Sequence, residues 1–317
     1  MRPHSFLLTS LLALACAPHV ARADTPCAGD DDEDEWSHVH EHSSDSSHGA
    51  PWRTAQATTL DEVRDAKPTG LIDVHAFAGT VHVTGTTQNQ LKVHANVSGD
   101  CRIDISPSGD RTSVRLQCAH GPGRGDLDIQ VPQANVVEVR TLSANITVQG
   151  VTGSLRLQSV TADIEVKGGA PTEIEAHTTN GNVHIDAPTA QVHAQSVSGD
   201  VHITGAHGKA SIHTVSGDCS LSGGDFSDVR YETVSGDVTF TGGITGSFEA
   251  QSHSGDVTMH VPATTNADVE LRTFSGDLEV DVGNGAKKSE HELDAKLGAG
   301  GARVRVRTFS GDVKLTR

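Results

Sequence analysis

Apolar and polar residues alternate with a period of two along much of the chain, most clearly after each Ser-Gly-Asp tripeptide. The residue after the aspartate is apolar, and so is the residue two positions further on. Because a period of two places successive side chains on opposite faces of a strand, each tripeptide is predicted to begin a strand with one buried face. These buried positions are Val201 and Ile203, Cys219 and Leu221, Val238 and Phe240, Val257 and Met259, Leu278 and Val280, and Val313 and Leu315.

A second alternating segment precedes each tripeptide. Apolar or aromatic residues stand eight and six positions before the aspartate, and a small hydroxylated residue stands four positions before it. We expect a second strand there, with the hydroxylated side chains turned inward where a corner narrows. The hydroxylated residues are Thr178, Ser196, Thr214, Thr233, Ser252, Thr273 and Thr308.

The recurrence of the tripeptide predicts the fold. Successive register positions from Asp126 to Asp277 are 18 to 21 residues apart. A unit this short cannot bury a core of its own and must stack on its neighbours, so the pattern predicts an all-β parallel β-solenoid with two main strands per coil. Ser-Gly-Asp ends at Asp200, Asp218, Asp237, Asp256, Asp277 and Asp312, and degenerate forms place Asp126, Asn145, Asp163 and Asn182 in the same register.

The repeated aspartates have two interpretations. In the structural one, Gly adopts a positive φ and the Asp side chain caps the turn by bonding nearby backbone amides. In the other, the column of carboxylates binds calcium, which would relieve the repulsion between neighbouring charges. We favour the turn-capping role.

The repeat is less regular toward both ends of the chain. Regular coils are predicted over about residues 121–282, with Thr80 and Asp100 fitting the register more loosely. Residues 283–301 interrupt the period, and residues 302–317 form a final coil. We expect a short helix over Lys287–Leu297 that covers the C-terminal end, because the ends of a solenoid need covering.

Composition restricts the core and the partners. Of 317 residues, 35% are hydrophobic but only 3% are aromatic, so the core must consist of Val, Ile, Leu and Thr. The formal net charge of −17 argues against binding to nucleic acid or to an anionic bilayer, since both are polyanions.

The N-terminus predicts export. Residues 1–23 have a basic start, an apolar stretch and an Ala-Arg-Ala cleavage pattern, which is typical of a secretory signal peptide. A lipoprotein that is lipidated at Cys16 is the less favoured alternative, because the usual Leu three residues before the Cys is missing. No later segment is apolar for long enough to span a bilayer.

Residues 24–50 form an acidic, His-rich tail that is predicted to be disordered, because it holds too few apolar residues to fold. Its histidines suggest a weak site for zinc, nickel or copper, since imidazole favours these metals over calcium. The alternative is a solubilising linker. The candidate ligands are His38, His40, His42 and His48.

Cys101 and Cys118 are predicted to form a disulfide. An antiparallel pairing around residues 106–113 places the two cysteines opposite each other and keeps the apolar faces together. Cys219 occupies a Val position of the repeat and is expected to be a buried free thiol.

Other polar residues are interpreted as structural. His82, His184 and His202 are expected to be surface histidines. Arg303, Arg305 and Arg307 are expected to form a solvated row that protects the edge of the last coil. No nucleophile elbow, phosphate loop, dinucleotide fingerprint or metalloprotease helix is present in the sequence.

The residues 70–85 (GLIDVHAFAGTVHVTG), followed by Leu91–Ala95 and then by Ser-Gly-Asp-Val repeats, resemble the bacterial putative adhesin family, an exported β-solenoid domain of unknown function. The resemblance covers about residues 70–317. It implies the solenoid fold and a location in the cell envelope, and it implies no catalytic residues.

We therefore expect residues 51–317 to form a non-enzymatic, adhesin-like structural or binding module of the envelope. Its location would be periplasmic, secreted or at the cell surface, and its partner an unidentified envelope component or protein. The alternatives are a periplasmic metal-binding protein that acts through the tail and a polysaccharide-acting β-helix enzyme.

Overall fold

The computed structural model describes residues 57–98, 100–119, 123–281 and 287–317. All of them belong to one unit, Trp52–Arg317. The predicted signal peptide (1–23) and the acidic tail with His38, His40, His42 and His48 lie outside the described residues. The described part of the chain is all-β and contains no helix, hence none that could cross a membrane.

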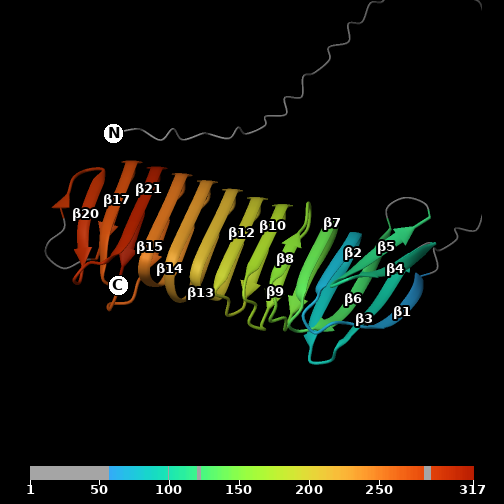
Figure 1. Ribbon diagram of the computed structural model, residues 1–317. Helices are drawn as coiled ribbons and strands as arrows, with labels where there is room; N and C mark the ends of the chain where they lie inside the picture. Colours follow the sequence, from blue (N-terminus) through green and yellow to red (C-terminus); the bar gives the residue numbers. More distant parts are fainter. Residues whose placement is uncertain (1–56, 99, 120–122, 282–286) are drawn as a thin grey trace, which may run out of the picture. The chain divides into compact units, whose positions relative to one another are not determined.

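The described residues form twenty-two strands. Figure 1 shows the strands of successive coils stacked next to one another. The N-terminal strands are β1 (Ala57–Asp65), β2 (Leu71–Thr86), β3 (Gln90–Ser98), β4 (Cys101–Ser108), β5 (Arg111–Cys118), β6 (Arg124–Pro132) and β7 (Val136–Gln149). The central strands are β8 (Leu155–Gln158), β9 (Ile164–Lys167), β10 (Ile174–Asn180), β11 (Val183–Asp186), β12 (Gln191–Ser198), β13 (Val201–Ser216), β14 (Cys219–Ser235), β15 (Val238–Ser254) and β16 (Val257–His260). The C-terminal strands are β17 (Ala267–Ser275), β18 (Leu278–Val280), β19 (Lys287–Lys288), β20 (Glu292–Leu297), β21 (Ala302–Ser310) and β22 (Val313–Thr316).

The central strands form the predicted parallel β-solenoid. Each coil has a pre-turn strand, a Ser-Gly-Asp turn or a related turn, and a post-turn strand. Neighbouring coils pair in parallel, so equivalent residues stack. Val201, Cys219, Val238 and Val257 are in register with one another and are all buried.

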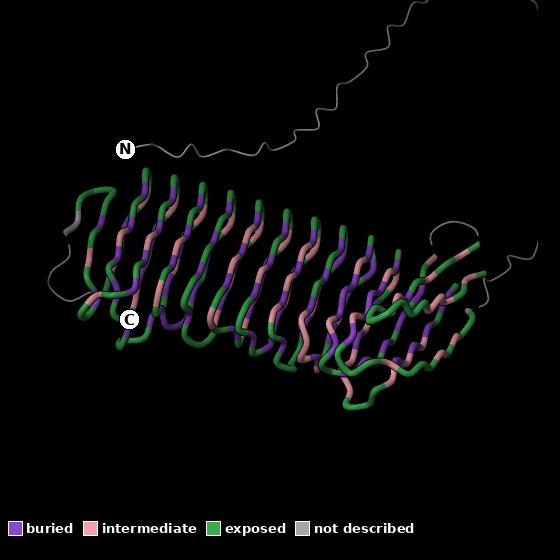
Figure 2. The backbone as a smooth tube through the Cα atoms, in the orientation of Figure 1, coloured by how far each residue is buried: buried purple, intermediate pink, exposed green. Residues whose placement is uncertain are grey.

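The core lies between the pre-turn and the post-turn strands, and buried and exposed positions alternate along both (Figure 2). The hydroxylated residues four positions before the aspartate, or before the asparagine that replaces it, are buried, as the sequence predicts. Four large rings of the central coils also pack together inside the core, with neighbouring ring centroids 4.9 to 5.8 Å apart. They are Phe226, Tyr231, Phe240 and Phe248.

At the C-terminal end, stacking order departs from sequence order. The last coil lies between two earlier ones: β21 pairs in parallel with β15 on one side and with β17 on the other, as Figure 1 shows. Its post-turn strand β22 lies in the same way between β16 and β18. Strands β21 and β22 are therefore flanked on both sides and form no edge of the stack.

The helix predicted over Lys287–Leu297 is wrong, because these residues form β19 and β20. Strand β20 pairs antiparallel with β17 and covers the outer side of that strand. The physical reason is the period of two in this segment: Leu293 and Leu297 are buried, whereas Glu292 and Asp294 are exposed.

The edge-protecting role predicted for Arg303, Arg305 and Arg307 is also wrong, because β21 is an internal strand. Arg305 lies in register between Glu249 and Glu270. Its Nε lies 3.2 Å from the Glu270 carboxylate. Arg305 and Arg307 thus join the last coil to β17 through ion pairs with Glu270.

The N-terminal end has a similar interruption. Strand β2 pairs in parallel with β7 on one side and with β5 and β6 on the other. Thr80 therefore lies in register between Asp126 and Asn145, although it precedes both in the chain. Beyond β6, the strands β3 and β1 continue the network in antiparallel order. Asp100 lies outside the stacked register, just before the β4–β5 hairpin.

The hairpin of β4 and β5 pairs Cys101 with Cys118, and a disulfide with an S–S distance of 2.02 Å joins them. Cys219 is buried and free. Burial, together with the neighbouring carboxylates of Asp218 and Asp200, raises the pKa of its thiol to about 12, so the group is unreactive at neutral pH.

Candidate functional site: an apolar ridge beside an aspartate ladder

The aspartates of the turns bond from coil to coil. The Oδ1 atom of Asp218 accepts a hydrogen bond from the backbone amide of Asp237 at 2.8 Å, and Oδ1 of Asp237 accepts one from the amide of Asp256 at 2.8 Å. The expected capping bonds to nearby amides are thus bonds to the next turn in the stack. We call this row the aspartate ladder. In stacking order it contains Asn145, Asp163, Asn182, Asp200, Asp218, Asp237, Asp256, Asp312 and Asp277.

The glycine of the tripeptide lets these turns approach closely. Gly236 has φ of +136°, and a Cβ atom placed there would lie 2.1 Å from the carbonyl oxygen of Gly217. Both the backbone angle and the close approach exclude other residues. The turns therefore stack closely, which brings each carboxylate within reach of the next amide.

Two asparagines show what the ladder bond requires. The Oδ1 atom of Asn182 accepts a hydrogen bond from the backbone amide of Asp200 at 2.9 Å. The ladder aspartates make the same kind of bond. Asn145 makes the equivalent bond to the amide of Asp163 at 3.3 Å. An amide oxygen is therefore sufficient for the stacking, and a negative charge is not needed for it.

A line of exposed, mostly apolar side chains runs beside the ladder, at the position three residues before the ladder residue of each coil. We call it the apolar ridge. Its large hydrophobic members are 40 to 68% exposed. They include every exposed large hydrophobic side chain of the described residues except Val63. In stacking order they are Phe77, Leu142, Val160, Val197, Val215, Val234, Phe309 and Phe274.

Three rings stack at the C-terminal end of the ridge. The ring of Phe309 lies between those of His253 and Phe274, with centroid distances of 5.0 and 4.8 Å and interplanar angles of 9° and 4°. This order exists because β21 lies between β15 and β17. The sequence analysis missed the ridge, although aligning the coils on the aspartate and reading three positions back would have found it.

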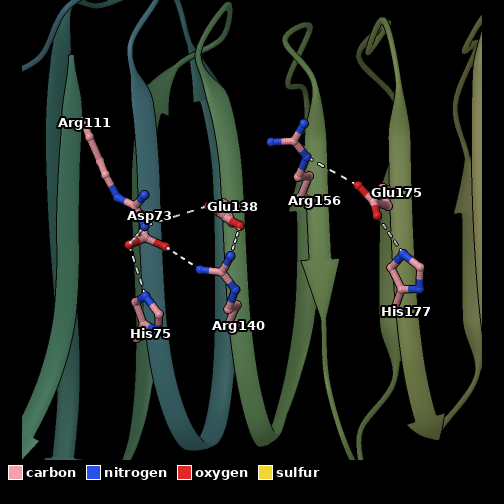
Figure 3. Close-up of polar contacts among 8 residues, drawn as sticks. All are labelled: Asp73, His75, Arg111, Glu138, Arg140, Arg156, Glu175 and His177. Atoms are coloured by element: carbon pink, nitrogen blue, oxygen red, sulfur yellow. Dashed lines mark hydrogen bonds and ion pairs between the residues drawn. The ribbon is translucent and has the colours of Figure 1, made fainter.

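The outward face of the N-terminal pre-turn strands carries a separate charged network (Figure 3). The buried carboxylate of Asp73 accepts hydrogen bonds from Arg111 Nη2 at 2.6 Å and Arg140 Nη1 at 3.4 Å, and His75 Nε2 lies 3.1 Å away. Arg140 also pairs with Glu138. Burial alone would raise the pKa of Asp73, but the hydrogen bonds and charges of Arg111 and His75 outweigh it and lower that pKa. Asp73 therefore remains ionised and is unsuited to act as a general acid.

The same face continues with a histidine cluster. His177 lies 2.9 Å from Glu175, which is also paired with Arg156 (Figure 3). The ring of His193 lies between those of His177 and His213, at centroid distances of 5.2 and 5.5 Å. Burial, with the nearby His177 and His213, lowers the pKa of His193. The ring nitrogens of His177 and His213 already have protein partners.

Few of the other candidate residues come together. His184 and His202 stack with centroids 5.0 Å apart on neighbouring post-turn strands, and His82 lies on β2, away from both. Within the described ranges, no three His, Cys, Asp or Glu side chains are arranged to hold a metal ion. The proposed metal ligands of the tail lie outside these ranges.

Comparison with known proteins places the chain in a family. The family model described as Toastrack DUF4097 matches residues 122–210 and 204–316. No curated protein matches the chain. The family assignment therefore rests on the match to the family model.

One solved structure supports the fold, and two others are similar at lower scores. A putative adhesin from Parabacteroides merdae ATCC 43184 is similar with a TM-score of 0.51 at 8% identity, with 82% of this chain and 96% of that chain covered. Putative adhesins from Parabacteroides distasonis ATCC 8503 and Bacteroides fragilis NCTC 9343 have TM-scores of 0.49 and 0.44 at 10% and 14% identity. Each of these two comparisons covers 83% of this chain, with 98% and 99% of the other chain. Because the two family matches together span more than half of the sequence and the stacked coils occupy the same residues, the chain belongs to the Toastrack DUF4097 family.

Proposed function

We propose that this protein is an exported, non-enzymatic, adhesin-like module of the bacterial cell envelope that binds its partner along the edge formed by the apolar ridge and the aspartate ladder. The observation that carries the proposal is the ridge itself. Isolated exposed apolar residues are ordinary, but an exposed line of them is characteristic of an interaction surface.

The ridge is not required for the solenoid core. The buried positions of the pre-turn strands are those eight, six and four residues before the ladder, and they point inward. The ridge position points outward, and in two coils it is polar, with Thr179 and His253. A polar residue therefore fits the fold there, and the apolar choice in the other coils favours contact with a partner.

A catalytic role is less well supported. The paired carboxylates of the charged network, Asp73 and Glu138, are held by Arg111 and Arg140, and the pKa of Asp73 is lowered. A glycoside hydrolase of the usual two-carboxylate type needs one protonated acid at its site, which requires a raised pKa. The network is better explained as an ionic contact between coils.

Export is supported by the N-terminal sequence and by the family resemblance. The similarity to the putative adhesin from Parabacteroides merdae agrees with a surface or envelope location.

A binding assay with envelope fractions tests the proposal. Labelled full-length protein is expected to bind saturably, and the triple variant V197S/V215S/V234S is expected to lose most of that binding. The control variant T239S/T241S changes exposed residues of a post-turn strand and should bind as the wild type does. Circular dichroism and thermal melting establish that each variant is folded. Equal binding by wild type and ridge variant would overturn the proposal.

A further inference from the structure

The charge of the aspartate ladder is in excess of what the fold needs. Asn182 and Asn145 supply the same amide-to-oxygen bond without a charge. Neighbouring carboxylates one strand spacing apart, about 4.8 Å, repel each other by roughly 1 kcal/mol even in water. Asparagine would avoid this repulsion, yet seven of the nine ladder positions are aspartate, and all seven are exposed.

The charged line and the apolar line follow the same edge of the solenoid. In each coil the ridge residue and the ladder residue are separated only by the Ser-Gly pair or its equivalent. Ser196 pairs with Thr214, and Ser198 pairs with Ser216, so Val197 and Val215 lie one coil apart. From Val197 to Val234 three successive coils present an exposed apolar side chain beside the carboxylates of Asp200, Asp218 and Asp237.

We propose that this edge binds a cationic amphipathic segment, in which a line of apolar side chains lies beside lysines or arginines. The inference rests on the proposed function and names the chemistry of the partner. The apolar side chains would cover the ridge, and the cationic side chains would pair with the ladder, whose charges are otherwise unused. Complementary potentials of this kind determine partner choice and orientation.

Charge argues against other occupants. A second copy would bring its own row of carboxylates against the ladder, and an anionic bilayer would be repelled in the same way. A neutral ligand would leave the negative charge of the aspartates without a role. The cationic segment is the occupant for which both lines of side chains are complementary.

Model peptides test the inference with the full-length protein. The probe is a synthetic peptide of about 15 residues in which Leu and Lys follow an amphipathic helical pattern. The matched control peptide has Glu at every Lys position. Isothermal titration is expected to show saturable binding of the Leu/Lys peptide, weakened by added salt, and none of the Leu/Glu peptide.

Two variants of equal net charge separate ladder binding from general attraction. In the first, Asp200, Asp218, Asp237 and Asp256 are replaced by Asn, which keeps each ladder oxygen. In the second, the exposed residues Asp225, Asp228, Asp268 and Asp294 are replaced by Asn. The ladder variant is expected to bind the Leu/Lys peptide about tenfold more weakly than the second variant.

Several results would overturn the inference. Equal losses in the two variants would show non-specific attraction, and equal binding of both peptides would show apolar contact alone. Self-association that the V197S/V215S/V234S variant abolishes would identify a second copy as the occupant, and co-flotation with phosphatidylcholine vesicles would identify a membrane. Envelope binding that depends on the ridge but not on ladder charge would leave the proposed function standing and remove this inference.

Discussion

The central coils and the two ends of this solenoid are built from the same strands but assembled by different rules. In the centre, β13, β14 and β15 pair in sequence order, with partners 17 to 19 residues apart. At the C-terminal end, β21 pairs with β15 across 56 residues and with β17 across 35. At the N-terminal end, β2 pairs with β7 across 65 residues. Local repetition is enough for the centre, whereas the ends require contacts between distant segments.

The difference follows from what an edge strand needs. A coil at the end of a parallel stack exposes unpaired backbone groups, which favour aggregation. Here the outer pre-turn strand β17 is covered by the antiparallel strand β20, and β3 and β1 continue the network beyond β6. The chain reverses direction to cover these strands. At the C-terminal end, the following strand β21 then lies between β15 and β17.

The interleaved order of the strands at the C-terminal end predicts the largest effect, a difference in disulfide formation between two double-cysteine variants. In the variant E249C/R305C the two cysteines occupy adjacent strands, about 4.8 Å apart, which a disulfide can span. In E249C/E270C they are two strands apart, about 9.6 Å, which a disulfide cannot span. Oxidation followed by non-reducing peptide mapping should find the bridge only in the first variant. The reverse result would mean that the coils stack in sequence order.

In the central coils, the substitution G236A is expected to destabilise the protein by about 3 kcal/mol, because a Cβ atom there meets the Gly217 carbonyl and φ is positive. The control G224A places a Cβ no closer than 3.6 Å to any atom and should be nearly neutral. Urea unfolding of both variants measures the difference. A neutral effect of G236A would contradict the close stacking of the turns.

At the N-terminal end, replacing both Cys101 and Cys118 by Ala is expected to cost about 3 kcal/mol, because the disulfide closes a loop between residues 17 apart in sequence. Hydrogen exchange should show faster opening of β4 and β5, with little change in β13 to β15. Uniform loss of protection along the whole solenoid would show that end and centre unfold as one unit.

Two histidines distinguish end and centre by opposite pH behaviour. At the N-terminal end, the hydrogen bond with Asp61 raises the pKa of His94. The contribution of this histidine to stability is therefore complete below its unfolded-state pKa and is lost as the pH rises through its folded-state pKa. In the centre, burial and neighbouring histidines lower the pKa of His193, so stability falls as pH drops below about 6.5 toward the folded value.

Titration by NMR should place the pKa of His94 above, and that of His193 below, the ordinary histidine value. The variant D61N should lower the pKa of His94 and leave that of His193 unchanged. Coincident titration of the two rings would refute the assigned environments.

The smallest effect is expected in the ladder. The variant D237A should cost on the order of 1 kcal/mol through the lost bond to the amide of Asp256, whereas D237N should be nearly neutral because it keeps the accepting oxygen. Millimolar calcium should leave the melting temperature of the wild type almost unchanged. A rise of many degrees would restore the calcium interpretation of the column.

Much of the fold could be predicted from the sequence, because strand faces and turn spacing are local properties. The alternation around Val201 and Val238 specifies which side chains are buried, and the recurring Ser-Gly-Asp specifies where the chain turns. The same logic would have predicted a strand within residues 287–297. The helix prediction was wrong because it rested on the break in the repeat and overlooked the alternation of Leu293, Ala295 and Leu297. The candidate site was half predicted: the aspartates were identified, but the exposed line beside them was not.

The sequence by itself determined the period, the inward and outward faces, the glycine-dependent turns and the register that brings Cys101 to Cys118. Each of these follows from covalent geometry over fewer than about twenty residues. Only the tertiary structure decided that β21 enters between β15 and β17, that Phe309 therefore stacks between His253 and Phe274, and that Asp73 meets Arg140 from 67 residues away. The physical reason is that every coil offers nearly the same strand edge, so the repeat cannot specify which edges pair at the ends; that choice depends on which edges the rest of the chain has left uncovered.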